Sequence, residues 1–304
     1  MKLTVEFPSV SYRWGPEGII QLAQAVEKIG YDQLDMFDHV VMGFATETRP
    51  DSRYPPKMPI MEAIVMLSFI AAATKTIGLG TEVLVLPQRN PTLTAKQIST
   101  LDTLSGGRVR LGVGVGWQES EYQALGHGFD NRGKRMDEAI SLLRSYWSEE
   151  SISLTSDFNQ IEAMAMEPKP PQGKDLPIWI GGSGAAALRR VGQLGDGWLA
   201  MSGLSDKQMN EAKEKIVQHA EKAGRDPSKL GWQMMLDNPP RDKAGKGFYS
   251  DKDRILAAAD RIKGLGFEWM AINVTAIFQS GARSVEALTD SLVTIHDDLH
   301  SRFD

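Results

Sequence analysis

The hydrophobic residues of this chain follow two spacings that alternate along its length. Several segments place apolar residues every three or four positions, a spacing that predicts amphipathic helices with one buried stripe. The clearest stripes are Ile19, Leu22, Ala23 and Val26; Met136, Ala139, Ile140, Leu143 and Trp147; and Val285, Leu288, Leu292, Ile295 and Leu299. Between the helical segments lie short runs rich in apolar and β-branched residues, which predict strands. These runs cover residues 3–7, 33–37, 77–84, 109–115, 177–180, 197–200, 231–236 and 270–274.

Strands that alternate with helices predict a parallel sheet built from right-handed βαβ crossovers. Eight such units in a chain of 304 residues fit a closed barrel, so the expected fold class is α/β with a (β/α)8 TIM barrel. An open doubly wound sheet shows the same alternation and stays as the rival architecture. Residues 1–304 are expected to form a single domain, because no segment has the composition of a linker.

Two segments interrupt the alternation. Residues 38–59 follow the second predicted strand and are rich in proline, arginine and aspartate, which indicates a long βα loop of the kind that carries function. Residues 148–175 contain Ile152, Leu154 and Phe158 in β-like alternation, followed by several prolines. We therefore predict a hairpin-like insertion, packed on the barrel, between the fourth helix and the fifth strand.

Charge and composition narrow the possible chemistry. The chain has 34 Lys and Arg residues against 39 Asp and Glu residues, a formal charge of −5, and no cysteine. Without a concentrated basic surface, nucleic acids and anionic membranes are not expected as partners. Without cysteine, the chain has no disulfide, thiolate nucleophile or cysteine metal ligand. The first residues lack the apolar core of a signal peptide, and the longest apolar run, residues 64–73, predicts a buried helix too short to span a membrane, so a cytoplasmic protein is expected.

Barrel enzymes act at the carboxyl ends of their strands, so the residues that follow each predicted strand are the candidates for chemistry. Asp38 and His39 follow the second predicted strand. A histidine can hold or donate a proton near neutral pH, as an acid–base or redox step requires. A loop histidine that only binds nearby backbone is the structural alternative. No metal-binding motif accompanies His39, so no metal site is expected.

Glycines follow or occupy two further strand ends. Gly112, Gly114 and Gly116 share one face of the fourth predicted strand, where they either admit a flat ligand or relieve crowding inside a narrow barrel. Trp117 comes next and either covers a bound ring or packs in the core. Residues 181–184 form a glycine-rich turn that opens directly into a helix, whose free N–H groups suit the phosphate of a cofactor. A tight turn without a ligand is the alternative.

Several motifs of the chain occur together, and in this order, in one known family. They read FDH at 37–39, VLVLPQRNP at 83–91, AKQ at 95–97, TLDTLSGGR at 100–108, LGVGVGW at 111–117, PIWIGG at 177–182 and GDGW at 195–198. On these motifs the chain resembles the luciferase-like monooxygenase superfamily from residue 1 to about residue 200. The ending Gly-Val-Gly-Trp looks most like the branch usually assigned to F420-dependent oxidoreductases.

The resemblance implies a barrel that binds FMN or the deazaflavin coenzyme F420 at its carboxyl-terminal face. Carried over to this chain, it places Asp38 and His39 beside the coenzyme ring, with His39 near the carbon that takes or gives hydride. It also implies a cis peptide bond between Glu82 and Val83, in a bulge behind the ring.

The resemblance concerns two more strand ends. Gly116 and Trp117, which end the fourth predicted strand, are also expected to bind the coenzyme. The residues that the resemblance assigns to the coenzyme phosphate are Gly181, Gly182, Ser183 and Gly184. Sugar-phosphate dehydrogenases of the deazaflavin branch carry a catalytic glutamate at the position of Trp117, so the resemblance argues against sugar-phosphate oxidation.

The sequence therefore predicts a coenzyme F420-dependent oxidoreductase that transfers hydride between the reduced deazaflavin and a small organic substrate, with His39 as the catalytic residue. The alternatives are an FMN-dependent two-component monooxygenase, a flavin-binding carrier barrel and a cofactor-free barrel lyase. The expected partners are the small-molecule substrate, a second copy in a homodimer and a separate reductase that supplies reduced coenzyme. We expect residues 40–59, the insertion from 148 and residues 238–251 to shape the substrate pocket.

Overall fold

The computed structural model describes residues 1–49, 54–237 and 247–303, and its central feature is a closed parallel barrel. The barrel strands are β1 (Lys2–Glu6), β2 (Gln33–Met36), β3 (Gly78–Thr81), β4 (Leu84–Val85), β5 (Val109–Gly114), β8 (Ile178–Gly181), β9 (Gly197–Ala200), β10 (Gly231–Met235) and β11 (Trp269–Asn273). They pair in the order β3-β2-β1-β11-β10-β9-β8-β5-β4, and an additional β3–β5 pairing closes the sheet. The (β/α)8 barrel is therefore confirmed, and the open doubly wound sheet is excluded.

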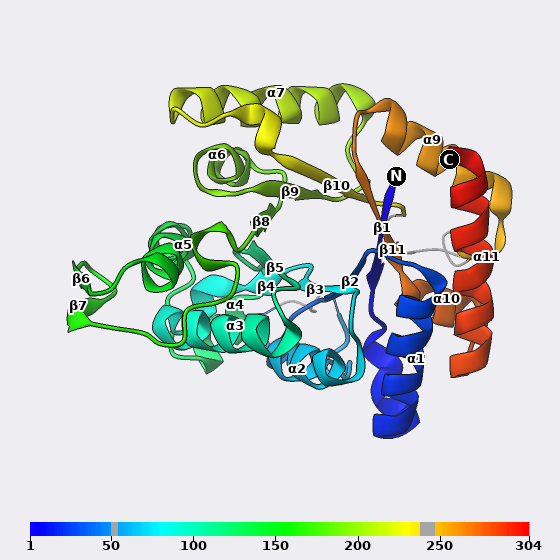
Figure 1. Cartoon of the computed structure of the whole chain (residues 1–304), viewed down its shortest axis with the longest axis horizontal. Helices are drawn as coiled ribbons and strands as arrows, with labels where there is room; N and C mark the ends of the chain where they lie inside the picture. The colour runs from blue at the N-terminus through cyan, green and yellow to red at the C-terminus, as the bar shows by residue number, and fades with distance from the viewer. Residues whose placement is uncertain (50–53, 238–246, 304) are drawn as a thin grey trace.

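Helices surround the strands on the outside of the barrel (Figure 1). They are α1 (Gly15–Ile29), α2 (Ala63–Ala73), α3 (Pro91–Ser105), α4 (Glu119–Ala124), α5 (Arg132–Ser148), α6 (Ala185–Leu194), α7 (Asp206–Lys222), α9 (Lys252–Gly264), α10 (Val274–Ser280) and α11 (Val285–Phe303). Short 3-10 turns are η1 (Ser9–Trp14), η2 (Leu86–Gln88), η3 (Gly173–Asp175), η4 (Pro227–Lys229) and η5 (Phe248–Ser250). The apolar stripes predicted from the sequence are the buried faces of α1, α5 and α11. In the described part of the chain, every helix is too short or too polar to cross a membrane.

The third strand position differs from its predicted form. The sequence predicts one strand over residues 77–84, whereas the structure has β3 and β4 on either side of a cis peptide bond between Glu82 and Val83. This is the bond at which the family resemblance implies a cis peptide. Both pieces pair with β5, so the barrel stays closed across the bulge.

The predicted insertion is an antiparallel hairpin between α5 and β8. Its strands are β6 (Ile152–Thr155) and β7 (Gln160–Met164), and Figure 1 shows it at the edge of the molecule beside α5. Ile152 is buried in the hydrophobic core, and Leu154 packs against that core. The hairpin is thus attached to the barrel by its apolar side chains.

A polar layer crosses the inside of the barrel. Arg110 on β5 forms an ion pair with the buried Asp35 on β2, with 2.6 Å between Nη2 and Oδ2. The Arg110 guanidinium carbon lies 4.5 Å from the ring centroid of Trp179 and 4.8 Å from that of Trp269. A buried charge needs such pairing, because an unpaired one is strongly destabilising. The layer supports the residues at the barrel mouth.

Candidate functional site

A cavity of about 610 Å³ opens at the carboxyl ends of the barrel strands. Residues at or just beyond strand ends line it: Glu6, Phe37, Glu82, Met201, Met235 and Asn273. The loop after β2 adds Tyr54, Pro55, Lys57, Met58 and Pro59. Sites that enclose a small organic molecule typically have about 300–1,000 Å³, so the cavity is large enough for one. Of the segment 238–251, which we expected to shape the pocket, residues 238–246 lie outside the described residues.

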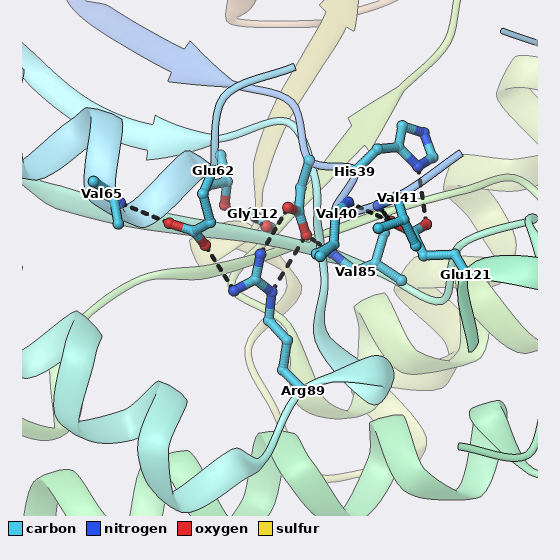
Figure 2. Close-up of polar contacts among 11 residues, drawn as sticks. His39, Val40, Val41, Glu62, Val65, Val85, Arg89, Gly112 and Glu121 are labelled. Atoms are coloured by element: carbon cyan, nitrogen blue, oxygen red, sulfur yellow. Dashed lines mark hydrogen bonds and ion pairs between the residues drawn. The ribbon is translucent and has the colours of Figure 1, made fainter. Parts of the chain in front are cut away.

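His39 packs on Tyr54, which lines this cavity, and a carboxylate from another βα unit holds its imidazole (Figure 2). Its side chain is only 7% exposed, and its Nδ1 lies 3.0 Å from Oε2 of Glu121 on α4. The other Glu121 oxygen accepts hydrogen bonds from the backbone N–H groups of Val40 and Val41. Burial tends to raise the pKa of Glu121, but the hydrogen bonds from His39, Val40 and Val41 hold this pKa below its usual value.

This pairing decides which ring nitrogen of His39 can act. A carboxylate acceptor favours a proton on Nδ1. Nε2 is then the nitrogen that exchanges a proton with a ligand.

Two aromatic rings pack on the imidazole. The centroid of Trp117 lies 5.2 Å from that of His39, the centroid of Tyr54 lies 5.6 Å from it, and all three rings meet edge to face. Trp117 is 38% exposed, so it stands at the site and not in the core. Because Tyr54 also lines the cavity, the His39 cluster and the cavity share a wall.

The carboxylate of Asp38 binds other groups of the protein through both of its oxygens. Its Oδ1 lies 2.7 Å from Nη2 of Arg89, and its Oδ2 accepts a hydrogen bond of 3.0 Å from the Val85 N–H. Arg89 also binds Glu62 at 2.7 Å, as Figure 2 shows. Burial raises the pKa of Asp38, although Arg89 opposes this rise. With both oxygens engaged, Asp38 holds the backbone that carries His39.

The glycine-rich turn links β8 to α6. Residues 182–184 are exposed, Gly182 has a left-handed φ of 110°, and Gly184 caps the helix without a side chain. The indole N–H of Trp198 donates a 2.8 Å hydrogen bond to the Gly182 carbonyl, which fixes the turn. The first N–H groups of α6 therefore face solvent and can bind an anion.

Val83 connects this turn with the cavity. A Cβ on Gly181 would lie 2.9 Å from Val83 Cγ1, and one on Gly114 would lie 2.6 Å from Val83 Cγ2. A Cβ on Gly116 would meet Val85 Cγ1 at 2.7 Å. These glycines thus make room for the neighbouring strand, which favours the crowding explanation. Because Glu82 lines the cavity and Val83 packs on Gly181, these two neighbouring residues link the cavity with the glycine-rich turn.

A family model described as luciferase-like monooxygenase matches residues 4–234. The chain belongs to this family.

Relatives of this luciferase-like protein include uncharacterized and F420-dependent proteins. An uncharacterized protein of Mycobacterium bovis is 34% identical over 62% of this chain and 66% of its own length. An F420-dependent glucose-6-phosphate dehydrogenase of Amycolatopsis mediterranei is 28% identical over 70% of this chain and 63% of its own length. The chain thus spans less than two thirds of the length of these relatives.

Solved structures share the luciferase-like barrel. A monooxygenase from Streptomyces bottropensis superposes with a TM-score of 0.81 and 18% identity over 100% of both chains. An F420-dependent secondary alcohol dehydrogenase, in complex with an F420-acetone adduct, gives a TM-score of 0.75 and 19% identity over 94% of this chain and 98% of its own. At these identities the likeness concerns the fold.

The residues predicted from the sequence lie at or just beyond the carboxyl ends of barrel strands, and of them Glu82 lines the cavity. The rings of His39 and Trp117 contact each other. Val83, next to Glu82, packs on Gly181 at the start of the glycine-rich turn. A flavin-type coenzyme fits this end of the barrel, because exposed helix N–H groups, a bulge and aromatic rings all follow the carboxyl ends of strands. Within the described residues, no group of three or more histidine, aspartate or glutamate side chains could hold a metal ion.

Three site residues are not predicted from the sequence: Glu6, Tyr54 and Glu121. The role of Arg89 as the partner of Asp38 is not predicted either. Glu6 is the last residue of β1, so it is a candidate when the carboxyl end of every strand is considered. Arg89 stands inside a family motif, but its pairing with Asp38 and Glu62 becomes visible only in the structure. Glu121 looks like a solvated helix residue, since charged and polar residues surround it in the sequence.

Proposed function

We propose that this chain is an oxidoreductase that uses coenzyme F420 to transfer hydride to or from a small organic substrate. The observation that carries the proposal is the position of His39, which Glu121 holds next to Trp117, Tyr54 and the cavity. Relatives and fold neighbours whose names state F420 dependence support this coenzyme. The sugar-phosphate substrate in the name of the former is not carried over, because Trp117 replaces the glutamate of that branch.

The proposed roles follow from the site. The deazaflavin, when bound, supplies the hydride donor or acceptor. The N–H groups at the start of α6 hold its phosphate, with Gly181, Gly182, Ser183 and Gly184 forming the turn. His39 holds or donates a proton through Nε2, and Glu121 fixes its Nδ1. The rings of Tyr54 and Trp117 exclude water from this face, while Asp38 positions the strand end.

An FMN-dependent two-component monooxygenase is the second candidate. It is favoured by fold neighbours such as a long-chain alkane monooxygenase, with a TM-score of 0.76 and 13% identity, and by the family description itself. Such an enzyme needs a separate reductase that supplies reduced FMN. A carrier barrel would retain a flavin without turnover of any donor or acceptor, and a barrel lyase would bind no flavin at all.

We also propose that the protein is a homodimer. Helix α2 is apolar on every side, and its outer face shows Val65 at 67% exposure and Phe69 at 40%. The sequence predicts a buried helix here, whereas this face is uncovered in one copy of the chain. A second copy would cover it. Cytoplasmic location stays a prediction.

Coenzyme titration tests the proposed function. The purified protein is titrated with F420 and, separately, with FMN, while absorbance and fluorescence are followed. We expect saturable F420 binding, and oxidation or reduction of bound F420 by an organic donor or acceptor without oxygen consumption. Tighter binding of FMN together with oxygen consumption would favour the monooxygenase. A colourless protein that binds neither coenzyme would contradict both.

A further inference from the structure

The cavity at the barrel mouth combines apolar walls with two acidic side chains. Its walls include Val10, Phe37, Met58, Met201 and Met235, and Glu6 and Glu82 are its two acidic residues. Among the described residues that line it, Lys57 is the one cation, and its side chain is exposed. Among the described residues, no buried cation therefore lines the cavity for an anionic ligand to pair with.

The orientation of Glu82 is fixed by the polar layer below it. The Gln233 side-chain carbonyl accepts hydrogen bonds from Thr4 Oγ1 at 2.8 Å and from Arg110 Nη2 at 2.9 Å. The Gln233 amide nitrogen must then point the other way, and it donates a 2.9 Å hydrogen bond to Glu82 Oε2. Within the described residues, Glu82 Oε1 has no hydrogen-bond partner, so this oxygen is available to a ligand in the cavity.

Glu6 extends the acidic surface from β1, which β2 separates from β3. β1 pairs with β2, whose Asp35 belongs to the same polar layer. In the described part of the chain, neither carboxyl oxygen of Glu6 has a hydrogen-bond partner. Two carboxyl groups thus face one apolar space, and Arg110 on β5 is already paired with Asp35 beneath them.

We propose that Glu6 and Glu82 are specificity-determining residues that admit neutral or cationic organic substrates to this cavity and exclude anionic ones. The proposal rests on the proposed function, because it takes the cavity as the substrate side of the coenzyme site. A protonated carboxyl donates a hydrogen bond to a neutral acceptor such as a carbonyl oxygen, and an ionised one pairs with a cation. Carboxylates and phosphates would lose their hydration there without gaining a buried cation, because the other polar side chains of the lining are neutral apart from the exposed Lys57.

The protonation state of the pair gives the site a characteristic pH dependence. Burial, followed by the charge of Asp35, raises the pKa of Glu82 to about 8, while Arg110 and Gln233 oppose this rise. Burial and the charges of Glu82, Asp237 and Asp35 raise the pKa of Glu6 well above its usual value. Glu82 is therefore mostly protonated at neutral pH and loses its proton as the pH rises through about 8. Donation to a neutral acceptor is lost in that range, and attraction of a cation is gained.

Three aromatic probes of similar size test the proposal without any coenzyme. Acetophenone is a neutral acceptor, benzamidine a cation and benzoate an anion, and binding is followed by ligand-observed NMR between about pH 6.5 and 9.5. With increasing pH we expect acetophenone to bind about three- to tenfold more weakly, the size of one lost hydrogen bond. Benzamidine should bind more tightly over the same range. Benzoate should bind about tenfold more weakly than acetophenone at pH 7.

Matched variants connect these effects to the two carboxyls. In the double variant Glu6→Gln plus Glu82→Gln, the amides donate at every pH, so acetophenone binding should become independent of pH and benzamidine should lose its gain. His39 and Lys57 remain in this variant, so any titration of theirs would persist. The control Met201→Leu conserves the volume of the cavity wall and should leave both pH profiles unchanged. The single variant Glu82→Gln serves if the double variant does not fold.

Three results would overturn the proposal. They are benzoate binding as tight as acetophenone binding, pH profiles of equal sign for acetophenone and benzamidine, and unchanged profiles in the variants. Failure of the proposed function is a separate observation, because it appears as absent coenzyme binding in the titration with F420 and FMN. If the probes behave as expected but the protein binds neither coenzyme, the proposed function is refuted and the proposed substrate selectivity still holds.

Discussion

At the scale of single residues, His39 depends on a carboxylate that the chain supplies more than eighty positions later. Glu121 is buried, with 1% exposure, and its two oxygens bind His39 on one side and two backbone N–H groups on the other. Buried polar groups are generally hydrogen-bonded, and here each partner satisfies the other. The imidazole therefore has one nitrogen fixed before any ligand arrives.

Glu121 acts through His39, and a double-variant experiment can test this relation. We expect Glu121→Gln to lower kcat by about tenfold to a hundredfold, the effect of a slightly misplaced catalytic group, without changing the Kd of the coenzyme. In a His39→Ala background, itself about a hundredfold or more slower, the same substitution should have no further effect on kcat. The measurements are steady-state turnover and coenzyme titration.

The control for this experiment is Glu119→Gln, which removes an exposed carboxylate two positions earlier on α4. It should leave kcat unchanged. Equal losses in the two backgrounds would show that Glu121 does not act through the histidine. A normal kcat in His39→Ala would remove the catalytic role of His39 itself.

Sequence reasoning reaches some of these residues and not others. His39 is found because polar residues just after a barrel strand are candidates by position alone. Glu121 cannot be found in this way, because a carboxylate on a short polar helix usually faces water. Its burial results from the loop backbone at Val40 and Val41, which folds over it and whose course is not encoded in any local pattern.

At the scale of elements, α6 presents its amino end at the barrel mouth without a capping side chain. The helix is ten residues long, and the turn before it is held by Trp198 and packed against Val83. A helix amino terminus carries a partial positive charge, which is strongest within the first turn. A negative charge placed in the turn would therefore compete with a bound phosphate.

Ser183 offers a test of the phosphate site. Ser183→Asp should weaken coenzyme binding by about tenfold, because the new carboxylate repels the phosphate and occupies the same N–H groups. Ser183→Asn has nearly the same shape without the charge and should bind the coenzyme about as well as the unaltered protein. Fluorescence titration measures both. Equal affinities of the two variants would place the phosphate elsewhere.

Most elements follow from the spacing of apolar residues. The predicted strands match the observed ones to within one residue at each end for β1, β2, β5, β8, β9, β10 and β11. The third strand is the exception, because the run from Ile77 to Leu84 shows no signal for an interruption at Glu82 and Val83. Only the family resemblance indicated that bulge, since spacing describes regular backbone and a cis bond is a local departure from it.

At the scale of the whole molecule, the outer face of α2 remains to be explained. Val65 and Phe69 are four residues apart and therefore share one face of the helix. Figure 1 shows α2 and α11 on different sides of the barrel, so a surface residue of α11 provides a distant control. We also propose that residues 1–304 act as one domain, since the described elements from β1 to α11 build one barrel.

The dimer is tested by mass in solution. We expect the unaltered protein to have twice the mass of the chain in analytical ultracentrifugation. Val65→Lys combined with Phe69→Lys should shift it to the monomer mass, because two charges cannot be buried in an apolar contact. Val293→Lys, at a position on α11 with 38% exposure, should leave the dimer intact. A monomeric unaltered protein, or a dimer that survives both α2 substitutions, would contradict this interface.

The contacts of Arg89 have one consequence for how this barrel can change. Arg89 binds Asp38 and Glu62, which stand at the two ends of the long loop after β2, so a single guanidinium ties the base of that loop together. Once the ends of a loop are fixed, added or exchanged residues between them cost little free energy. Residues 42–61 can therefore be exchanged between the two anchors to change the substrate preference, while Val40 and Val41 continue to hold Glu121 and, through it, His39.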